Sequence, residues 1–238
     1  MPLELRDTLP ADYENRIIAA SADCIDKDKG SGDACHAVGE FFAVIRKDYV
    51  KARESYATNC DIRSHSASCF NLGRLLLGGQ GGGIDEKGAA RRFSQACDNG
   101  FGPACHHLGL IAIDADDYRK GYRALERACS FREAESCYII GSRLLKAAQN
   151  DEETSFFQRR IVPWFSTTNH FTRDVPRAQA CLEIACDEGH APACHNLAVL
   201  FKHGDDQVLS NETKHLEYKK KTLELVKAAG AMQGVRIS

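Results

Sequence analysis

Long apolar runs are missing from this sequence of 238 residues, and no uncharged stretch approaches the roughly 18 apolar residues that a membrane-spanning helix needs. A basic surplus is missing as well, because 31 Lys and Arg are set against 33 Asp and Glu, for a formal net charge of −2. Nucleic-acid-binding proteins need a basic patch or stripe. We therefore expect neither a membrane span nor a nucleic-acid partner.

The N-terminal segment that ends at Cys24 lacks the features of two common targeting signals. It carries acidic residues early and has no apolar core of about 7 to 15 residues, which a secretory signal requires. It also lacks the arginine-rich, acid-poor composition of a mitochondrial transit peptide. Methionine and tryptophan are scarce, with 2 and 1 residues, whereas there are 11 cysteines. The cysteines are therefore the feature that needs an explanation.

Ten of the cysteines form close pairs along the chain, with separations of 11, 9, 8, 8 and 8 residues. The first members of the first four pairs recur after 36, 37 and 32 residues, a period typical of helical-hairpin arrays. Cys181 is left over and is expected to be a free thiol. In sequence order the pairs are Cys24 with Cys35, Cys60 with Cys69, Cys97 with Cys105, Cys129 with Cys137, and Cys186 with Cys194.

The second cysteine of each pair opens a predicted helix, as in residues 69–73, Cys-Phe-Asn-Leu-Gly. The apolar residue three positions on and the small residue four positions on share a face with the cysteine, so a neighbouring helix can approach closely. A second predicted helix ends at the first cysteine of the next pair, as at Cys97, where Gly100 follows to end the helix. Each unit is thus predicted to be a helical hairpin.

The eight-residue spacing predicts disulfide bonds across turns. On an unbroken helix, cysteines eight residues apart would have Cα atoms about 12 Å apart, beyond the roughly 7 Å that a disulfide tolerates. With a turn between them, the bond links the end of one helix to the start of the next. The segments within the pairs Cys60–Cys69 and Cys129–Cys137 contain no glycine, and the second of these could continue as helix.

The repeat unit resembles that of the Sel-one-like repeat family, an α/α hairpin related to the tetratricopeptide repeat. The residues that carry this resemblance are 69–73, 81–85, 87–90, 96–100 and 104–105. It implies an all-α solenoid of about five hairpins linked by disulfides, in a single domain over residues 1–238. The repeats are expected to begin near residues 35, 69, 105, 137 and 194.

Within that family, the chain resembles the cysteine-rich members of animal mitochondria that support assembly of cytochrome c oxidase. Residues 180–190, followed by Cys194, carry this likeness, and the extra Cys181 fits it. The resemblance implies a non-enzymatic assembly or scaffold factor in the mitochondrial intermembrane space, oxidised on import by the disulfide-relay machinery. It would bind a protein client of respiratory-chain assembly through its concave surface. Paired cysteines agree with an oxidising compartment.

Two alternative functions stay open. One is a haem-binding protein or thiol–disulfide oxidoreductase that uses Cys181 or an exchangeable pair. The other is a secreted cysteine-rich repeat protein. Four histidines could be cast as metal or haem ligands, but neither a C-x-x-C-H motif nor closely spaced cysteine pairs accompany them, so no catalytic, cofactor or metal residue is expected. These histidines are His36, His106, His107 and His195.

Three further segments carry expectations. The spacing from Cys137 to Cys186 leaves an insertion of roughly 20 residues at about 146–175, which includes Trp164 and Phe165. It either covers the solenoid or binds a partner, since aromatic side chains dominate many interfaces.

The glycine-rich run at 78–83 is interpreted as a turn between helices, not as a phosphate-binding loop. A helix at about 213–229, with Asn211-Glu212-Thr213 at its start, should cap the array, although its lysines also suit a docking face.

Overall fold

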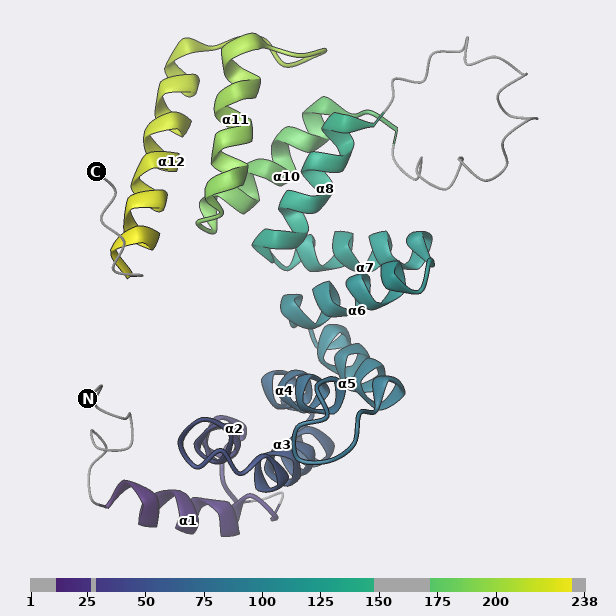
Figure 1. The fold of residues 1–238 in the computed structure, drawn as a ribbon, viewed down its shortest axis with the longest axis vertical. Helices are drawn as coiled ribbons and strands as arrows, with labels where there is room; N and C mark the ends of the chain where they lie inside the picture. The colour runs from purple at the N-terminus through teal and green to yellow at the C-terminus, as the bar shows by residue number, and fades with distance from the viewer. Residues whose placement is uncertain (1–11, 27–28, 148–171, 233–238) are drawn as a thin grey trace, which may run out of the picture. The chain divides into compact units, whose positions relative to one another are not determined.

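A computed structural model describes residues 12–26, 29–147 and 172–232 (Figure 1). The described residues form helices joined by short connections, with one isolated bridge between Asp205 and Val208. The helices are α1 (Tyr13–Asp23), α2 (Gly32–Glu40) continued by the π-helix η2 (Phe41–Ile45), α3 (Tyr49–Arg63), α4 (Ser66–Leu77), α5 (Glu86–Asp98), α6 (Gly102–Asp114), α7 (Tyr118–Ser130), α8 (Ala134–Lys146), α10 (Val175–Asp187), α11 (Ala191–His203) and α12 (Glu212–Met232).

The helices alternate in the way that the cysteine pattern predicts. The second cysteine of each pair lies in the first turns of α2, α4, α6, α8 or α11, which we call the A helices. The first cysteine lies at the end of α1, α3, α5, α7 or α10, which, together with α12, we call the B helices. The predicted fold class, α/α hairpins linked by disulfides, is confirmed.

Four B helices have an aspartate as their N-cap residue. In each case this aspartate lies 12 residues before the cysteine at the end of the same helix. The side chain of each aspartate accepts a hydrogen bond from the backbone N–H three residues on, which satisfies a donor that the helix itself leaves unpaired. The four are Asp48, Asp85, Asp117 and Asp174. Asn211 caps α12 in the same way, with 3.0 Å between its Oδ1 and the backbone nitrogen of Lys214.

The turns within the cysteine pairs all contain a residue in the left-handed region. Three are glycines, which adopt positive φ without steric cost: Gly30 (φ 69°), Gly100 (83°) and Gly189 (87°). The other two are Ser64 (φ 51°) and Arg132 (φ 61°). These two residues reverse the chain in the segments that lack glycine, so α7 ends at Ser130 and does not continue through Cys137.

Small residues allow A and B helices to pack closely, as predicted. A Cβ atom at Gly39 would lie 2.4 Å from the ring of Tyr56, and one at Gly73 would lie 2.6 Å from the ring of Phe93. In two later hairpins the equivalent contacts are between Gly109 and Leu125 and between Gly141 and Leu182. The bulky partner always lies four residues before the first cysteine of the next pair. One small and one large residue therefore form a contact that recurs in successive hairpins.

The chain forms two compact units, Met1–Leu108 and Gly109–Ser238. In the first, Ile17, Val38 and Phe41 pack together, and Tyr56 packs with Leu72 and other residues. In the second, one cluster surrounds Leu125, Ile140 and Leu144 and another surrounds Leu182, Leu197 and Phe201. The single domain expected over residues 1–238 stays a prediction.

The expected insertion and C-terminal cap can be compared with the helix boundaries. Helix α8 ends at Lys146 and α10 begins at Val175, the limits expected for the insertion. Trp164 and Phe165 lie outside the described residues, so their role is untested. The last helix is slightly longer than expected, spanning Glu212–Met232. No helix in the described ranges has the length and apolar character needed to cross a membrane.

Candidate functional site

The structure joins all ten paired cysteines, and Cys181 is the one cysteine without a bond among the eleven, all of which lie in the described ranges. The S–S distances are 2.03–2.12 Å and the Cα–Cα distances 4.6–5.5 Å. Each bonded cysteine is buried. The bonds therefore lie inside the hairpin packing and not on its surface.

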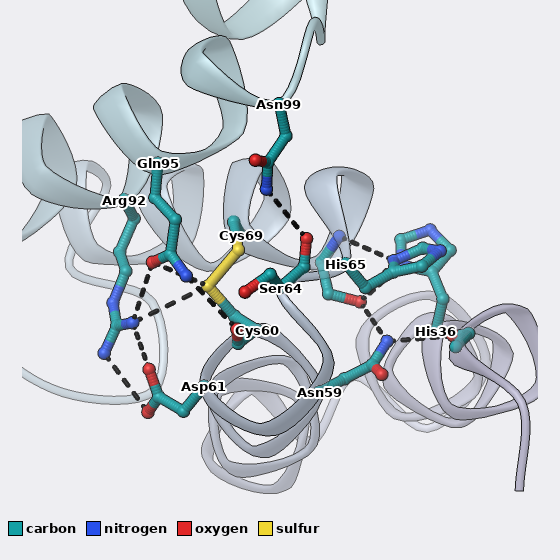
Figure 2. The surroundings of a disulfide bond; sticks show 12 residues. His36, Asn59, Cys60, Asp61, Ser64, His65, Cys69, Arg92, Gln95 and Asn99 are labelled. Atoms are coloured by element: carbon teal, nitrogen blue, oxygen red, sulfur yellow. Dashed lines mark hydrogen bonds and ion pairs between the residues drawn. A yellow bond between two sulfur atoms is a disulfide. The ribbon is translucent and has the colours of Figure 1, made fainter.

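The Cys60–Cys69 bond is enclosed by polar groups from the next B helix (Figure 2). Arg92 of α5 pairs with Asp61 and places a guanidinium nitrogen 3.6 Å from Cys60 Sγ. Gln95 donates from Nε2 to the Cys60 carbonyl at 3.2 Å, and Asn99 donates from Nδ2 to the Ser64 carbonyl at 3.0 Å. These contacts add to the capping of α3, because the Cys60 carbonyl also accepts the backbone N–H of Ser64 at 3.0 Å.

A second polar cluster lies on the other side of this bond. Asn59 is fully buried and donates from Nδ2 to Ser68 Oγ at 2.7 Å. His65 caps α4, because its Nδ1 accepts the backbone N–H of Ser68 at 3.3 Å, and its Nε2 lies 3.1 Å from Asp33 Oδ1. His36 Nδ1 lies 3.0 Å from the same hydroxyl of Ser68. Burial lowers the pKa of His36, against the opposing effect of Glu40.

Ser68 contacts His65, and His65 contacts Asp33, as the three side chains of a Ser-His-Asp hydrolytic triad do. In this protein the three side chains have a structural role. The Ser68 side chain has no exposed surface, so no substrate reaches its oxygen. A nucleophilic serine must be within reach of the reacting atom as well as of its base. The three side chains instead connect α2 to α4.

The same histidine arrangement recurs in the second unit. His190 caps α11 by accepting the Ala193 N–H at 3.2 Å, and its Nε2 lies 2.9 Å from Glu135 of α8. His65 and His190 both lie four residues before the second cysteine of a pair. Their acidic partners lie two residues before the second cysteine of the preceding pair. In both cases, the histidine that caps one A helix thus also contacts an acidic side chain of the preceding A helix.

The histidines considered as ligands lie on three A helices: His36 on α2, His106 and His107 on α6, and His195 on α11. His107 Nδ1 lies 3.1 Å from the Pro103 carbonyl, and its ring packs near Phe70 and Phe93. His195 is exposed on α11. Within the described ranges, the structure contains no group of three or more His, Cys, Asp or Glu side chains placed to hold a metal ion. Whether haem binds is untested.

Cys181 is half-buried in α10 beside the second-unit core. Burial raises the pKa of its thiol above the usual range, and Arg177 opposes this effect only in part. Because the thiolate is the nucleophile, a raised pKa makes this cysteine a poor one at neutral pH. The structure therefore gives no support to Cys181 as a redox-active group.

Clefts between successive B helices form the second kind of candidate site, and the sequence analysis did not predict them. The first cleft, of about 810 Å³, lies among α1, α2, η2 and α3, with Ile18, Ile25 and Phe42 among its lining residues. Ion-paired Glu14 and Arg46 also line it.

The second cleft, of about 360 Å³, lies among α7, α8 and α10. Arg119, Arg123 and Arg177 line it, with Glu126 and Asp174 beside them. A third, of about 340 Å³, lies among α3, α4 and α5. Each cleft is bounded by two successive B helices and the A helix between them. Their lining residues come from segments far apart in sequence, so no local motif marks them.

Sequence comparison identifies several relatives, some of which match about four-fifths of the chain. It is 29% identical over 203 residues to the Xenopus tropicalis protein named cytochrome c oxidase assembly factor 7, covering 81% of this chain and 79% of that protein. The chain resembles cytochrome c oxidase assembly factor 7. The Drosophila melanogaster homologue of this assembly factor is 25% identical over 215 residues, covering 81% and 80%. The human assembly factor is 32% identical over 127 residues, covering 49% and 55%. No protein-family model matches the sequence.

Structure comparison identifies Sel1 repeat proteins. The chain superimposes on the Sel1 repeat protein of Oxalobacter formigenes with a TM-score of 0.71 and 17% identity, covering 91% of this chain and 57% of that one. For c5321, an antigen of uropathogenic Escherichia coli with an SLR fold, the TM-score is 0.59 at 17% identity, with coverage of 82% and 38%. The chain thus spans about 38 to 57% of these longer chains. At this identity the likeness establishes the fold alone: the chain has a Sel1-repeat fold.

Proposed function

We propose that this protein is a non-enzymatic assembly factor for cytochrome c oxidase, which acts by binding a protein client in the clefts between its B helices. The observation that carries the proposal is the likeness to cytochrome c oxidase assembly factor 7 along about four-fifths of both chains. The repeat architecture supports a binding role, because arrays of helical repeats form extended binding surfaces.

We further propose that it works in the mitochondrial intermembrane space, where the disulfide-relay machinery oxidises it. Five buried disulfides support an oxidising compartment, since the cytosol keeps most thiols reduced. Each bond closes a loop of only 8 to 11 residues, so oxidation requires no distant pairing.

Deletion of the protein in cells of its own organism tests the function. We expect less assembled cytochrome c oxidase on native gels, with restoration by the wild-type chain. Affinity capture from detergent-solubilised mitochondria should recover subunits or other assembly factors of that complex. Normal levels of the assembled oxidase after deletion, in cells that lack a second copy of the gene, would sink the proposal. The compartment is tested separately, by protease protection before and after rupture of the outer membrane.

A further inference from the structure

The second cleft contains two arginines that form no ion pair within the described residues. Arg119 and Arg123 lie one turn apart on α7 and both line the cleft. Over the ranges that the structure describes, neither has a carboxylate partner, whereas Arg177 pairs with Glu126 at 2.6 Å. A guanidinium stays charged at any physiological pH, and its planar fork matches a carboxylate. Two guanidinium groups are therefore available to an anionic ligand.

The charges around the two arginines leave a small positive excess. The cleft lies beside the first turns of both α7 and α10, where helix dipoles place partial positive charge and where the carboxylates of the capping residues Asp117 and Asp174 oppose it. Among the lining residues three arginines face two acids, Glu126 and Asp174, so the formal charge is 3 − 2 = +1. Leu144, which is buried, also lines the cleft. The site thus combines an apolar contact with an excess of cations.

The size and charge of the cleft favour an acidic peptide segment as ligand. A volume of about 360 Å³ accommodates a few side chains, not a large cofactor. A nucleic acid would need many more cations, because its affinity depends on neutralising several phosphates. Carboxylate side chains fit both the guanidinium forks and the modest net charge.

We propose that the second cleft is a docking site for an acidic segment of a protein client, in which Arg119 and Arg123 bind glutamate or aspartate carboxylates. This inference rests on the proposed function, since it names the part of the surface that recognises the client and the chemistry of the recognised segment. Arg177 borders the site, but its charge is offset by the ion pair with Glu126.

A fluorescein-labelled peptide of eight glutamates serves as the probe, and its anisotropy is titrated with the full chain at low salt. We expect binding that weakens at least tenfold in Arg119→Ala/Arg123→Ala. Both arginines are exposed, so the melting temperature should stay unchanged. The matched control is Lys219→Ala/Lys227→Ala, which removes the same charge from exposed positions of α12 and should change the affinity less than twofold.

An equal loss of peptide affinity in both double variants would show non-specific charge attraction and overturn the proposal. So would undiminished binding to the arginine variant, or binding of inorganic phosphate at the cleft with none of the peptide. Capture from mitochondria separates this inference from the function. If the wild-type chain captures no oxidase-assembly component, the function fails; if the arginine variant captures as much as wild type, the function stands and the docking site fails.

Discussion

The first and second clefts occupy the same place in their hairpins but offer different chemistry. Counted back from the first cysteine of the pair, the positions at ten and six residues are Glu14 and Ile18 in α1, and Arg119 and Arg123 in α7. All four residues line their clefts. The first cleft is also about twice as large, at 810 Å³ against 360 Å³. The repeat therefore fixes where a cleft lies, whereas the residues at these two variable B-helix positions set the charge of its lining.

The largest effect should come from removing a disulfide beside either cleft. In the entropy model, closing loops of this length contributes about 2.5 to 3 kcal/mol, and the value changes by only about 0.3 kcal/mol between loops of 8 and 11 residues. We expect Cys24→Ala/Cys35→Ala and Cys129→Ala/Cys137→Ala to lower the free energy of unfolding by similar amounts in urea titrations. If the two losses differ by nearly the full value of one bond, the two units depend on their disulfides differently.

Exchanging the variable positions should transfer the binding chemistry. In a chain whose second cleft is disabled by Arg119→Ala/Arg123→Ala, we expect Glu14→Arg/Ile18→Arg to restore binding of the eight-glutamate peptide by roughly tenfold, equivalent to about 1.4 kcal/mol. Anisotropy titration measures the gain. Glu14→Gln/Ile18→Gln is the uncharged control. If the arginine exchange binds no better than this control, charge at these positions does not determine what the cleft binds.

Removing the capping aspartate at either cleft should lower the free energy of unfolding equally, but should change peptide binding only at the second cleft. Asp48→Ala and Asp174→Ala should each cost about 1 kcal/mol, the usual value of an N-cap, in the free energy of unfolding. Only Asp174 lies among the arginines, so its loss should also strengthen peptide binding severalfold. Asp174→Asn separates the two effects, because asparagine keeps the cap and removes the charge. Weaker peptide binding in Asp174→Asn would contradict the charge model of the second cleft.

The smallest effect concerns the thiol beside the second cleft. Because burial raises the pKa of Cys181, less thiolate is present at pH 8 than in an exposed cysteine, and alkylation by iodoacetamide should be slower than that of glutathione. Arg177 lowers this pKa, so Arg177→Ala should raise it further and slow alkylation. Lys202→Ala, at an exposed site on α11, is the control. Mass spectrometry of the intact chain follows the reaction, and faster alkylation of Arg177→Ala would contradict this account.

The hairpin frame was predictable because its signals are local and periodic. Cysteine spacing and the small residue four positions after the second cysteine anticipate both the disulfides and the close packing at Gly73. A further signal, an aspartate at a constant spacing before the first cysteine, was present but missed in the sequence analysis. It recurs at Asp48, Asp85, Asp117 and Asp174 and identifies the start of each helix.

Other features were not predictable, for physical reasons. Ser64 and Arg132 adopt left-handed φ, which sequence rules assign to glycine or asparagine, because the packed helices on both sides impose the turn. The arginine cleft unites Arg123 with Arg177, which are more than fifty residues apart. Only the packing of α7, α8 and α10 brings them together, and the cysteine pattern, which places these helices in successive repeats, does not indicate which of their side chains face each other.

The short loops closed by the disulfides also bear on how the chain reaches its oxidised state. Ten cysteines admit on the order of a thousand pairings, yet each of the five bonds joins two cysteines that follow one another among those ten. Because short loops close at the lowest entropic cost, random encounter favours the native partner for each of these cysteines except Cys186, whose nearest cysteine is the free Cys181, five residues away. Once α10 forms, its geometry holds the Cα atoms of Cys181 and Cys186 about 7.5 Å apart along the helix axis, beyond the reach of a disulfide. A chain presented end-first to an oxidant can therefore complete each hairpin in turn, without waiting for the residues that follow.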